Sequence, residues 1–189
     1  MSKNERQLTF EDVFPVPSQV TEQLLKERSP VSLLLDGLKN PLNIGMIFRL
    51  AEAARIKKIY TYNMLDFKQS KKLSKVARST DKYLEVEHIY KLEGVKNLKE
   101  ENDLIGLEIT THSKPYYKFK PVRPLVLIIG NEKHGISQEI IDLSDQCIHI
   151  PMLGVNTSMN VAIASGIGVY HLLEAGGWMD GGRLITPPS

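Results

Sequence analysis

Side chains that can do chemistry occur in three segments, and the first is PLNIGMIFRLAEAA (residues 41–54). Asn43 can cap a helix here, because its side-chain oxygen can accept an N–H from the first turn. Gly45 would then lie inside that helix at a cost of about 1 kcal/mol relative to alanine. Gly45 and Arg49 share one helix face, so the missing side chain leaves room for another molecule beside the guanidinium. An ordinary capped helix with a surface arginine remains an equally good interpretation of this segment alone.

The second segment, LVLIIGNEKHGIS (residues 125–137), is a buried strand that runs into a glycine-bounded loop and then a helix. Gly130 and Gly135 permit close backbone approach, and Glu132 places a carboxylate beside that backbone. Ligands of open α/β sheets bind at the carboxyl ends of strands. The spacing fails both the dinucleotide fingerprint and the P-loop, so NAD and nucleoside triphosphates are disfavoured.

The third segment, IHIPMLGVNTSMNVAIASGIGVY (residues 148–170), contains a strand that ends at Pro151, a polar loop, and a helix that begins near Asn160. Small residues on this helix predict close packing against a neighbouring helix, either within the subunit or across a dimer interface. A capped core helix would explain the helix itself. It would not explain so polar a loop after a buried strand.

Motifs for metal and nucleophilic chemistry are absent. The histidines are scattered without ligand spacing, and neither HExxH nor a G-x-S-x-G elbow occurs. Cys147 is the single cysteine, so an internal disulfide is excluded and a zinc cluster is disfavoured. We expect no metal.

The elements that position these segments alternate between strand and helix. Short apolar runs predict strands over residues 31–35, 58–62, 104–109, 125–129 and 147–150, and apolar spacing predicts helices over residues 43–55, 92–101, 137–143 and 159–174. This alternation predicts an α/β fold with a mostly parallel sheet flanked by helices. We expect an arm and one helix over residues 1–30, the domain over residues 31–175, and a flexible tail over residues 176–189.

The composition is that of a globular protein. The chain has 189 residues, of which 24% are charged and 42% hydrophobic, and a net charge of +2. It has no membrane-spanning apolar segment and no signal peptide, so we expect a cytoplasmic protein. Because the net charge is low, nucleic-acid binding would need local patches. Two candidates are the basic segment 68–82, with Lys71, Lys72, Lys75 and Arg78, and KPYYKFK at residues 114–120; a solvated surface explains each equally well.

Together, in this order, the three segments resemble the three motifs of the SpoU family of RNA ribose methyltransferases, within the SPOUT superfamily. The first motif matches Asn43, Gly45, Arg49 and Ala51, and the second matches Gly130, Glu132 and Gly135. The third matches residues 150–152 and 158–162. The resemblance covers residues 31–174.

This resemblance implies a carboxyl-terminal trefoil knot, a homodimer and S-adenosylmethionine as cofactor. It also implies that the cofactor is held by main-chain groups near Thr110, Gly130, Ile150 and Met159. The other residues of the implied cofactor site are Glu132, Gly135, Met152 and Ser158.

The resemblance makes Arg49 the central catalytic residue. Because a guanidinium is almost never deprotonated in a protein, we expect Arg49 to clamp the RNA phosphate and act by electrostatics, not as a general base. Asn43 and Ser158 would position the ribose hydroxyl, and Asn160 and Glu132 would shape the pocket. The expected reaction is methylation of a ribose 2′-hydroxyl of RNA, with tRNA favoured over rRNA. Base methylation and a non-catalytic RNA-binding or assembly role are the alternatives.

Overall fold

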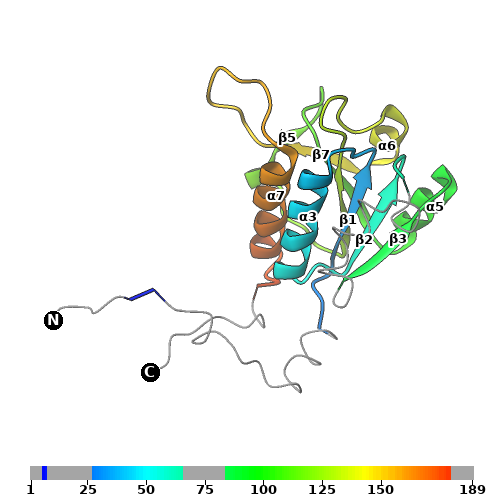
Figure 1. Ribbon diagram of the computed structural model, residues 1–189, viewed down its shortest axis with the longest axis horizontal. Helices are drawn as coiled ribbons and strands as arrows, with labels where there is room; N and C mark the ends of the chain where they lie inside the picture. Colours follow the sequence, from blue (N-terminus) through cyan, green and yellow to red (C-terminus); the bar gives the residue numbers. More distant parts are fainter. Residues whose placement is uncertain (1–5, 8–26, 66–83, 180–189) are drawn as a thin grey trace.

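The computed structural model describes residues 6–7, 27–65 and 84–179, and a seven-stranded parallel sheet lies at the centre of this described part (Figure 1). Every strand pairs in parallel with its neighbours. Across the sheet the order is β3 (Glu85–His88), β2 (Lys58–Tyr62), β1 (Val31–Asp36), β6 (Leu125–Ile129), β4 (Asp103–Leu107), β7 (Gln146–His149) and β5 (Lys114–Pro115). The predicted α/β class with a mostly parallel sheet is confirmed.

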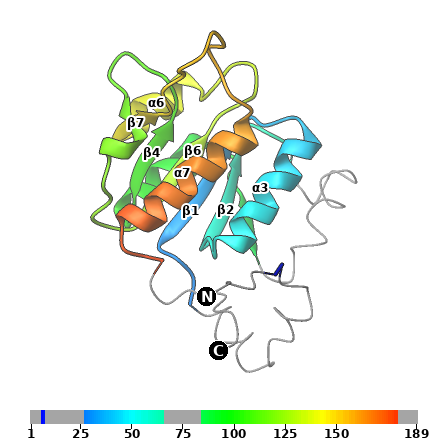
Figure 2. The ribbon, with the colours of Figure 1, turned by 90° about the vertical axis from the view of Figure 1, so that its left-hand side faces the viewer.

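Helices cover both faces of the sheet, which explains why its central strands are apolar throughout. On one face, α3 (Pro41–Ala53) and α7 (Val161–Ala175) lie side by side (Figure 2). On the other face lie α5 (Leu92–Asn97) and α6 (Gln138–Leu143), with the short 3-10 helices η1 (Leu98–Glu100) and η2 (Tyr116–Lys118) in connections. In β1, Leu33 and Leu35 pack under α3 and α7, whereas Leu34 packs under α5 and α6.

The strand order reverses between β1 and β6. The chain first builds β1, β2 and β3 outward in one direction, and then places β6 and β4 on the opposite side of β1. A crevice forms outside the carboxyl ends of the strands at such a switch point, and ligands of open α/β sheets bind there. The loops that follow β1, β6, β4 and β7 therefore define where a site is expected.

The start of α3 corrects one prediction. Asn40, not Asn43, is the N-cap, and its Oδ1 accepts the N–H of Leu42 at 2.9 Å. Pro41 occupies the first helical position, where its fixed φ fits and its missing N–H has no consequence. The helix consequently begins one turn early, and the Asn43 side chain is released for other contacts.

The sequence patterns missed two edge strands. β3 alternates exposed glutamates with half-buried residues, and Lys58 of β2 holds Glu85 and Glu87 at 2.6 and 2.7 Å. β5 has only two residues, one of them a proline. Neither strand has an apolar run, because each lies at the edge of the sheet.

The small residues of α7 divide between two environments. A Cβ on Gly168 would lie 3.1 Å from Leu107 Cδ2, so Gly168 packs against the sheet, whereas a Cβ on Gly166 would meet nothing within 4 Å. After α7, the N–H of Trp178 donates to Leu173 O at 2.8 Å, and Trp178 packs against the core. The predicted helix in residues 1–30 and most of the predicted tail lie outside the described residues. No helix among the described residues is long and apolar enough to cross a membrane.

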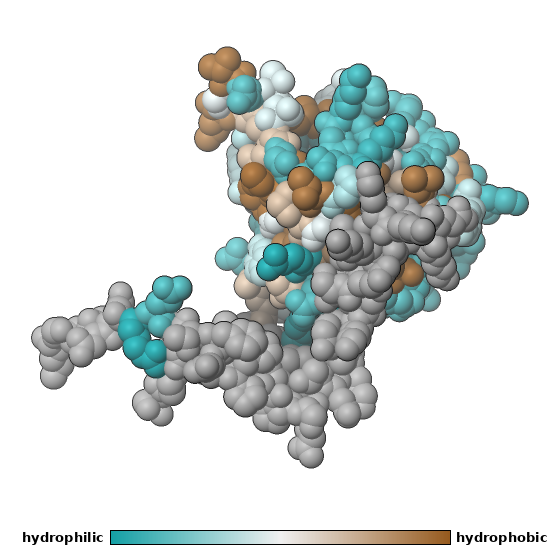
Figure 3. All heavy atoms as spheres, viewed as in Figure 1, coloured by the Kyte–Doolittle hydropathy of each residue, from teal (hydrophilic) through white to brown (hydrophobic). Residues whose placement is uncertain are grey.

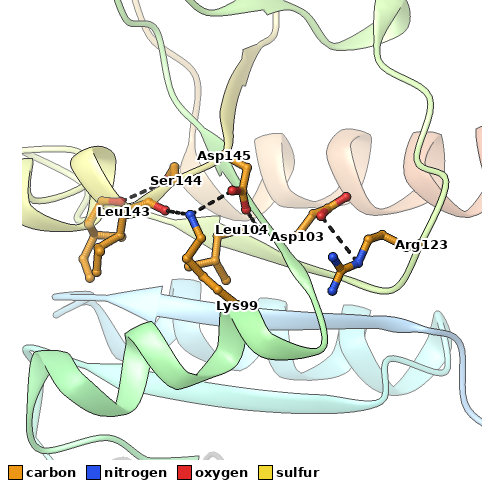
Figure 4. Close-up of polar contacts among 8 residues, drawn as sticks. Lys99, Asp103, Leu104, Arg123, Leu143, Ser144 and Asp145 are labelled. Carbon is orange, nitrogen blue, oxygen red and sulfur yellow. Dashed lines mark hydrogen bonds and ion pairs between the residues drawn. The ribbon is translucent and has the colours of Figure 1, made fainter.

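A polar cluster fastens the amino-terminal end of β4 to the loop before β7 (Figure 4). The Lys99 ammonium donates to Leu143 O and contacts Asp145 Oδ1, both at 2.8 Å, while Asp145 Oδ2 accepts the N–H of Leu104 at 2.8 Å. Burial alone would raise the pKa of Asp145, but these donors lower it below its ordinary value.

We expect Asp145→Ala to lower the free energy of unfolding by about 1–3 kcal/mol, because the N–H of buried Leu104 loses its acceptor. Urea unfolding measures this change. The matched control is Arg123→Ala, whose partly exposed pair with Asp103 spans 3.5 Å and should contribute less than about 1 kcal/mol. Equal effects of the two substitutions would contradict this account.

Candidate active site

The loop after β6, residues 130–136, is a tight turn that only glycine permits at two positions. A Cβ on Gly130 would lie 2.2 Å from the backbone nitrogen of Ile136, and Gly135 has a φ of +70°. Asn131 and Gly135 exchange two backbone hydrogen bonds of 2.9 Å. The Asn131 amide donates to Gly37 O at 2.6 Å, which ties the loop to the turn after β1.

Glu132, the central residue of this loop, faces the start of α3. Its carboxylate accepts the N–H groups of Lys39 at 3.3 Å and Asn40 at 3.0 Å, and the side-chain amide of Asn43 at 3.1 Å. Acidic groups are stabilised at a helix amino terminus. Glu132 therefore fixes the position of α3 relative to the β6 loop.

A chain of three side chains joins the three predicted motifs. Asn160 is the N-cap of α7, and its Oδ1 accepts the N–H groups of Ala162 at 2.9 Å and Ile163 at 3.3 Å. Its amide nitrogen donates to Asn43 Oδ1 at 3.1 Å. Asn43, which is buried, donates in turn to Glu132. Each asparagine thus donates through its amide nitrogen and accepts through its amide oxygen. These hydrogen bonds fix the orientation of both amides in the chain Asn160, Asn43, Glu132.

The charge state of Glu132 holds this chain together. Burial alone would raise the pKa of Glu132, but the hydrogen bonds from the backbone and from Asn43 outweigh it and lower the pKa. A lowered pKa in the folded protein means that the stabilisation is complete above the ordinary value of 4.5 and is lost as the pH falls through the lowered value.

We therefore expect the wild-type protein to lose stability below about pH 4.5 more steeply than Glu132→Gln, whose side chain does not titrate. Thermal unfolding followed between pH 7 and pH 3 measures the difference. The glutamine variant should be less stable near neutral pH. Its NH₂ group replaces one carboxylate oxygen and cannot accept the hydrogen bonds that Lys39, Asn40 and Asn43 donate. Parallel pH profiles would show that Glu132 does not contribute.

A cavity of about 640 Å³ opens beside this chain at the carboxyl ends of β6, β4 and β7. Its volume falls within the range of small-molecule sites, roughly 300–1,000 Å³. Every predicted cofactor or catalytic residue except Arg49 lines it: Asn43, Thr110, Gly130, Glu132, Gly135, Ile150, Met152, Ser158, Met159 and Asn160. Among the described residues, no three His, Cys, Asp or Glu side chains are grouped to hold a metal ion.

The cavity has an acidic wall. Glu108 and Glu132 both line it, and neither forms an ion pair with a described residue. Lys133 also lines the cavity, so the two carboxylates of the cavity exceed its ammonium groups by one and leave a surplus of negative charge. S-adenosylmethionine carries a sulfonium and an ammonium group against a single carboxylate. The donor set therefore fits this cationic cofactor.

Arg49 lies outside the cavity. Its side chain is exposed on α3, and it forms no hydrogen bond or ion pair with a described residue. Leu42 and Met46 lie two turns and one turn earlier on the same helix face, and they are also exposed, at 76% and 47%. The single chain thus separates Arg49 from the residues predicted to act with it.

The two predicted RNA-binding patches have different outcomes. Lys71, Lys72, Lys75 and Arg78 lie outside the described residues. In residues 114–120, Lys114, Lys118 and Lys120 are exposed, as is Tyr117 at 58%, but Tyr116 and Phe119 pack against the core. Tyr116 stacks edge-on against His171, with ring centroids 5.0 Å apart. Only Tyr117 remains available as a stacking platform there.

Sequence reasoning missed several residues that shape the site. Asp36 is buried, and its Oδ2 accepts the N–H of Ser137 at 2.7 Å, which anchors the end of the β6 loop. Asn40, Asn131 and Glu108 also make loop contacts. Asp36 and Glu108 could have been predicted from the sequence, because each acidic residue directly follows the apolar run of a strand, where ligands of α/β sheets bind.

The fold and the cavity together define an α/β domain with a cavity of small-molecule size at the carboxyl ends of a parallel sheet, where ligands of such folds bind. A family model described as the SpoU rRNA methylase family matches residues 30–170. The chain belongs to this family.

Named relatives are RNA ribose methyltransferases. The tRNA (guanosine(18)-2′-O)-methyltransferase of Aquifex aeolicus is 31% identical over 157 residues, which cover 81% of this chain and 73% of that protein. A 23S rRNA (guanosine-2′-O-)-methyltransferase of Blochmanniella floridana is 26% identical over 186 residues, covering 95% of this chain and 73% of that protein.

Solved structures share the fold. An Aquifex aeolicus tRNA-modifying enzyme aligns with a TM-score of 0.71 at 24% identity, over 91% of this chain and 88% of that one. An AdoMet-bound rRNA methyltransferase from Sinorhizobium meliloti aligns with a TM-score of 0.70 at 21% identity, over 80% of this chain. The present chain covers 59% of that second protein.

Proposed function

We propose that this protein transfers a methyl group from S-adenosylmethionine to a ribose 2′-hydroxyl of RNA, with tRNA as the favoured substrate. The observation that carries the proposal is the hydrogen-bonded order Asn160, Asn43, Glu132 at the edge of an acidic cavity. These side chains come from three motifs far apart in the sequence, and they meet where a ligand of this fold binds. Family membership and the names of the relatives support the same activity.

S-adenosylmethionine, when bound, supplies an electrophilic methyl group, and the chain must align the hydroxyl with it and ease the loss of the hydroxyl proton. The β6 loop and the third-motif loop would hold the cofactor. Asn43 and Asn160 are already fixed by each other and by Glu132, so they would not need to reorganise in the reaction. Arg49 would hold the RNA phosphate and stabilise the developing oxyanion through the positive charge and planar donors of its guanidinium group.

We infer a homodimer from the position of Arg49, which lies outside the cavity of its own chain. Exposed apolar side chains gather over α3 and α7 and at the tip of the loop before α7 (Figure 3). On α3 they are Leu42 and Met46, and on α7 they are Ile163 and Tyr170, exposed at 58% and 44%. Arg49 lies on the face of α3 that carries Leu42 and Met46. A second copy docked on this α3/α7 face would therefore bring Arg49 of one subunit to the cavity of the other.

Ile163→Glu tests the dimer. A charge on the apolar α3/α7 face should shift the protein from dimer to monomer, as measured by light scattering after size-exclusion chromatography. Val122, exposed at 88% in the segment before β6 and on neither α3 nor α7, provides the matched control Val122→Glu, which should stay dimeric. An Ile163→Glu protein that remains dimeric would exclude this interface.

Three finer proposals rest on the resemblance. We propose a trefoil knot in the carboxyl-terminal part, and the return of the chain from β7 to α7 beside α3, across β4, β6 and β1, supports it. Lys71, Lys72, Lys75 and Arg78 are proposed to bind the RNA backbone. A cytoplasmic location remains a prediction.

Mass-spectrometric mapping of ribose methylation in total RNA, from cells with and without the protein, tests the activity. The expected result is one 2′-O-methylated nucleotide that disappears with the protein, and that the purified protein restores in the presence of S-adenosylmethionine. Restoration of a methylated base instead would overturn the ribose assignment. Tight RNA binding without binding of S-adenosylmethionine would indicate a non-catalytic role.

A further inference from the structure

Glu108 directly follows β4, at the carboxyl end of this strand. Its Oε1 accepts the N–H of Ile109 at 2.9 Å, and its Oε2 accepts the N–H of Ile136 at 3.2 Å. The side chain is half-buried and lines the cavity. One backbone donor therefore holds each oxygen, and these donors come from the β4 and β6 loops.

The β6 loop is shaped around this carboxylate. A Cβ on Gly135 would lie 2.4 Å from Glu108 Oε2 and 3.1 Å from its carboxyl carbon. Any residue other than glycine at position 135 would displace the carboxylate as well as strain a φ of +70°. Glu108 thus has a defined place in the cavity wall and does not extend freely into solvent.

The carboxylate retains capacity to bind. A carboxylate has about four acceptor positions, and the described residues fill two of those on Glu108. No described cation pairs with it, so its negative charge is available to donors in the cavity. Glu132 differs, because it is occupied by three donors from the start of α3.

We propose that Glu108 accepts hydrogen bonds from the ribose hydroxyls of the cofactor's adenosine; this rests on the proposed function, which places S-adenosylmethionine in the cavity. In the sheet, β4 is separated from β1 by β6, so Glu108 lies on the side of the β6 loop opposite Asn43. A cofactor whose methyl group faces Asn43 and Asn160 has its adenosine on the Glu108 side. Acidic side chains accept ribose hydroxyls in the same way in other α/β nucleotide sites.

A cycle of protein and ligand changes tests this contact. Calorimetry would compare S-adenosylhomocysteine with its 2′-deoxy and 3′-deoxy forms, on the wild type and on Glu108→Ala. For the wild type, removal of at least one hydroxyl should weaken binding roughly ten- to hundredfold, as expected for a hydrogen bond to a charged group. For Glu108→Ala, removal of the same hydroxyl should change the affinity less than about threefold, because the partner is gone.

Glu108→Gln is a second variant, for the case that the alanine variant disorders the β6 loop. Its glutamine oxygen can still accept a hydrogen bond from one of the two backbone N–H groups. Glu93→Gln, on the surface of α5, is the matched control and should reproduce the wild-type ligand series. Equal losses on removal of each hydroxyl in the wild type and in both Glu108 variants would overturn the proposal. Failure of the wild type to bind S-adenosylhomocysteine at all would instead overturn the cofactor assignment, and this proposal with it.

Discussion

Replacing Arg49 by alanine should lower the rate of methyl transfer to RNA by about 100- to 1,000-fold, the usual effect of removing one electrostatic group from a transition state. The affinity for S-adenosylmethionine should stay within about threefold of wild type, because Arg49 lies outside the cavity of its own chain. Single-turnover transfer of a labelled methyl group measures the rate, and calorimetry measures the affinity.

Arg49→Lys separates two roles of the guanidinium. Lysine keeps the positive charge but loses the planar pair of donors that grips a phosphate, so we expect most of the alanine defect to remain. Near-normal turnover with Arg49→Lys would show that charge alone suffices and that no bidentate clamp exists. Mixed dimers offer a further check, since an Arg49→Ala subunit paired with a Gly130→Ala subunit should regain one working site only if Arg49 acts across the interface.

Gly130→Ala is expected to lower the affinity for S-adenosylmethionine at least about 100-fold, because displacement of a positioning loop by roughly 1 Å is enough for such a loss. The added methyl would lie 2.2 Å from the nitrogen of Ile136 and 2.3 Å from the carbonyl carbon of Gly135, both backbone atoms that cannot rotate away. The free energy of unfolding should fall by about 1–3 kcal/mol, as for other overpacked sites. Calorimetry and urea unfolding measure the two effects.

Gly154→Ala is the matched control, because a methyl at position 154 would meet nothing within 4 Å. Its unfolding free energy should stay within about 0.5 kcal/mol of wild type, as for most surface substitutions. Cofactor affinity unchanged by Gly130→Ala would show that residues 130–136 do not hold the ligand.

Apolar periodicity was sufficient to predict the central elements of the fold. β2 and β6 have the predicted bounds, and α3 and α7 differ from their predicted ranges by one or two residues at each end. The order of the strands was beyond such reasoning, because the insertion of β6 between β1 and β4 depends on which helix covers which face. Edge strands β3 and β5 were missed because they have too little burial to leave a pattern.

The residues of the candidate site were predictable as motifs, but their connections were not. Asn43 was predicted as a cap, yet the tertiary contacts with Glu132 and Asn160 determine its role, and no local pattern encodes a contact across 89 or 117 positions. Arg49 was placed with these residues by the resemblance, whereas the single chain keeps it apart. In the proposed homodimer a second chain would bridge that separation, and the contacts between two chains leave no pattern in the apolar spacing of one sequence.

The span of these contacts also has a consequence for biosynthesis. Asn160 donates a hydrogen bond to Asn43, which lies 117 positions earlier in the chain. Asn160 is also the N-cap of α7, so its position depends on that helix. A ribosome-bound chain that has not yet released α7 lacks the wall of the cavity formed by residues 157–161 and 164. Competence for the cofactor therefore arises only after α7 has been translated, so translation products that stop before α7 would not bind it.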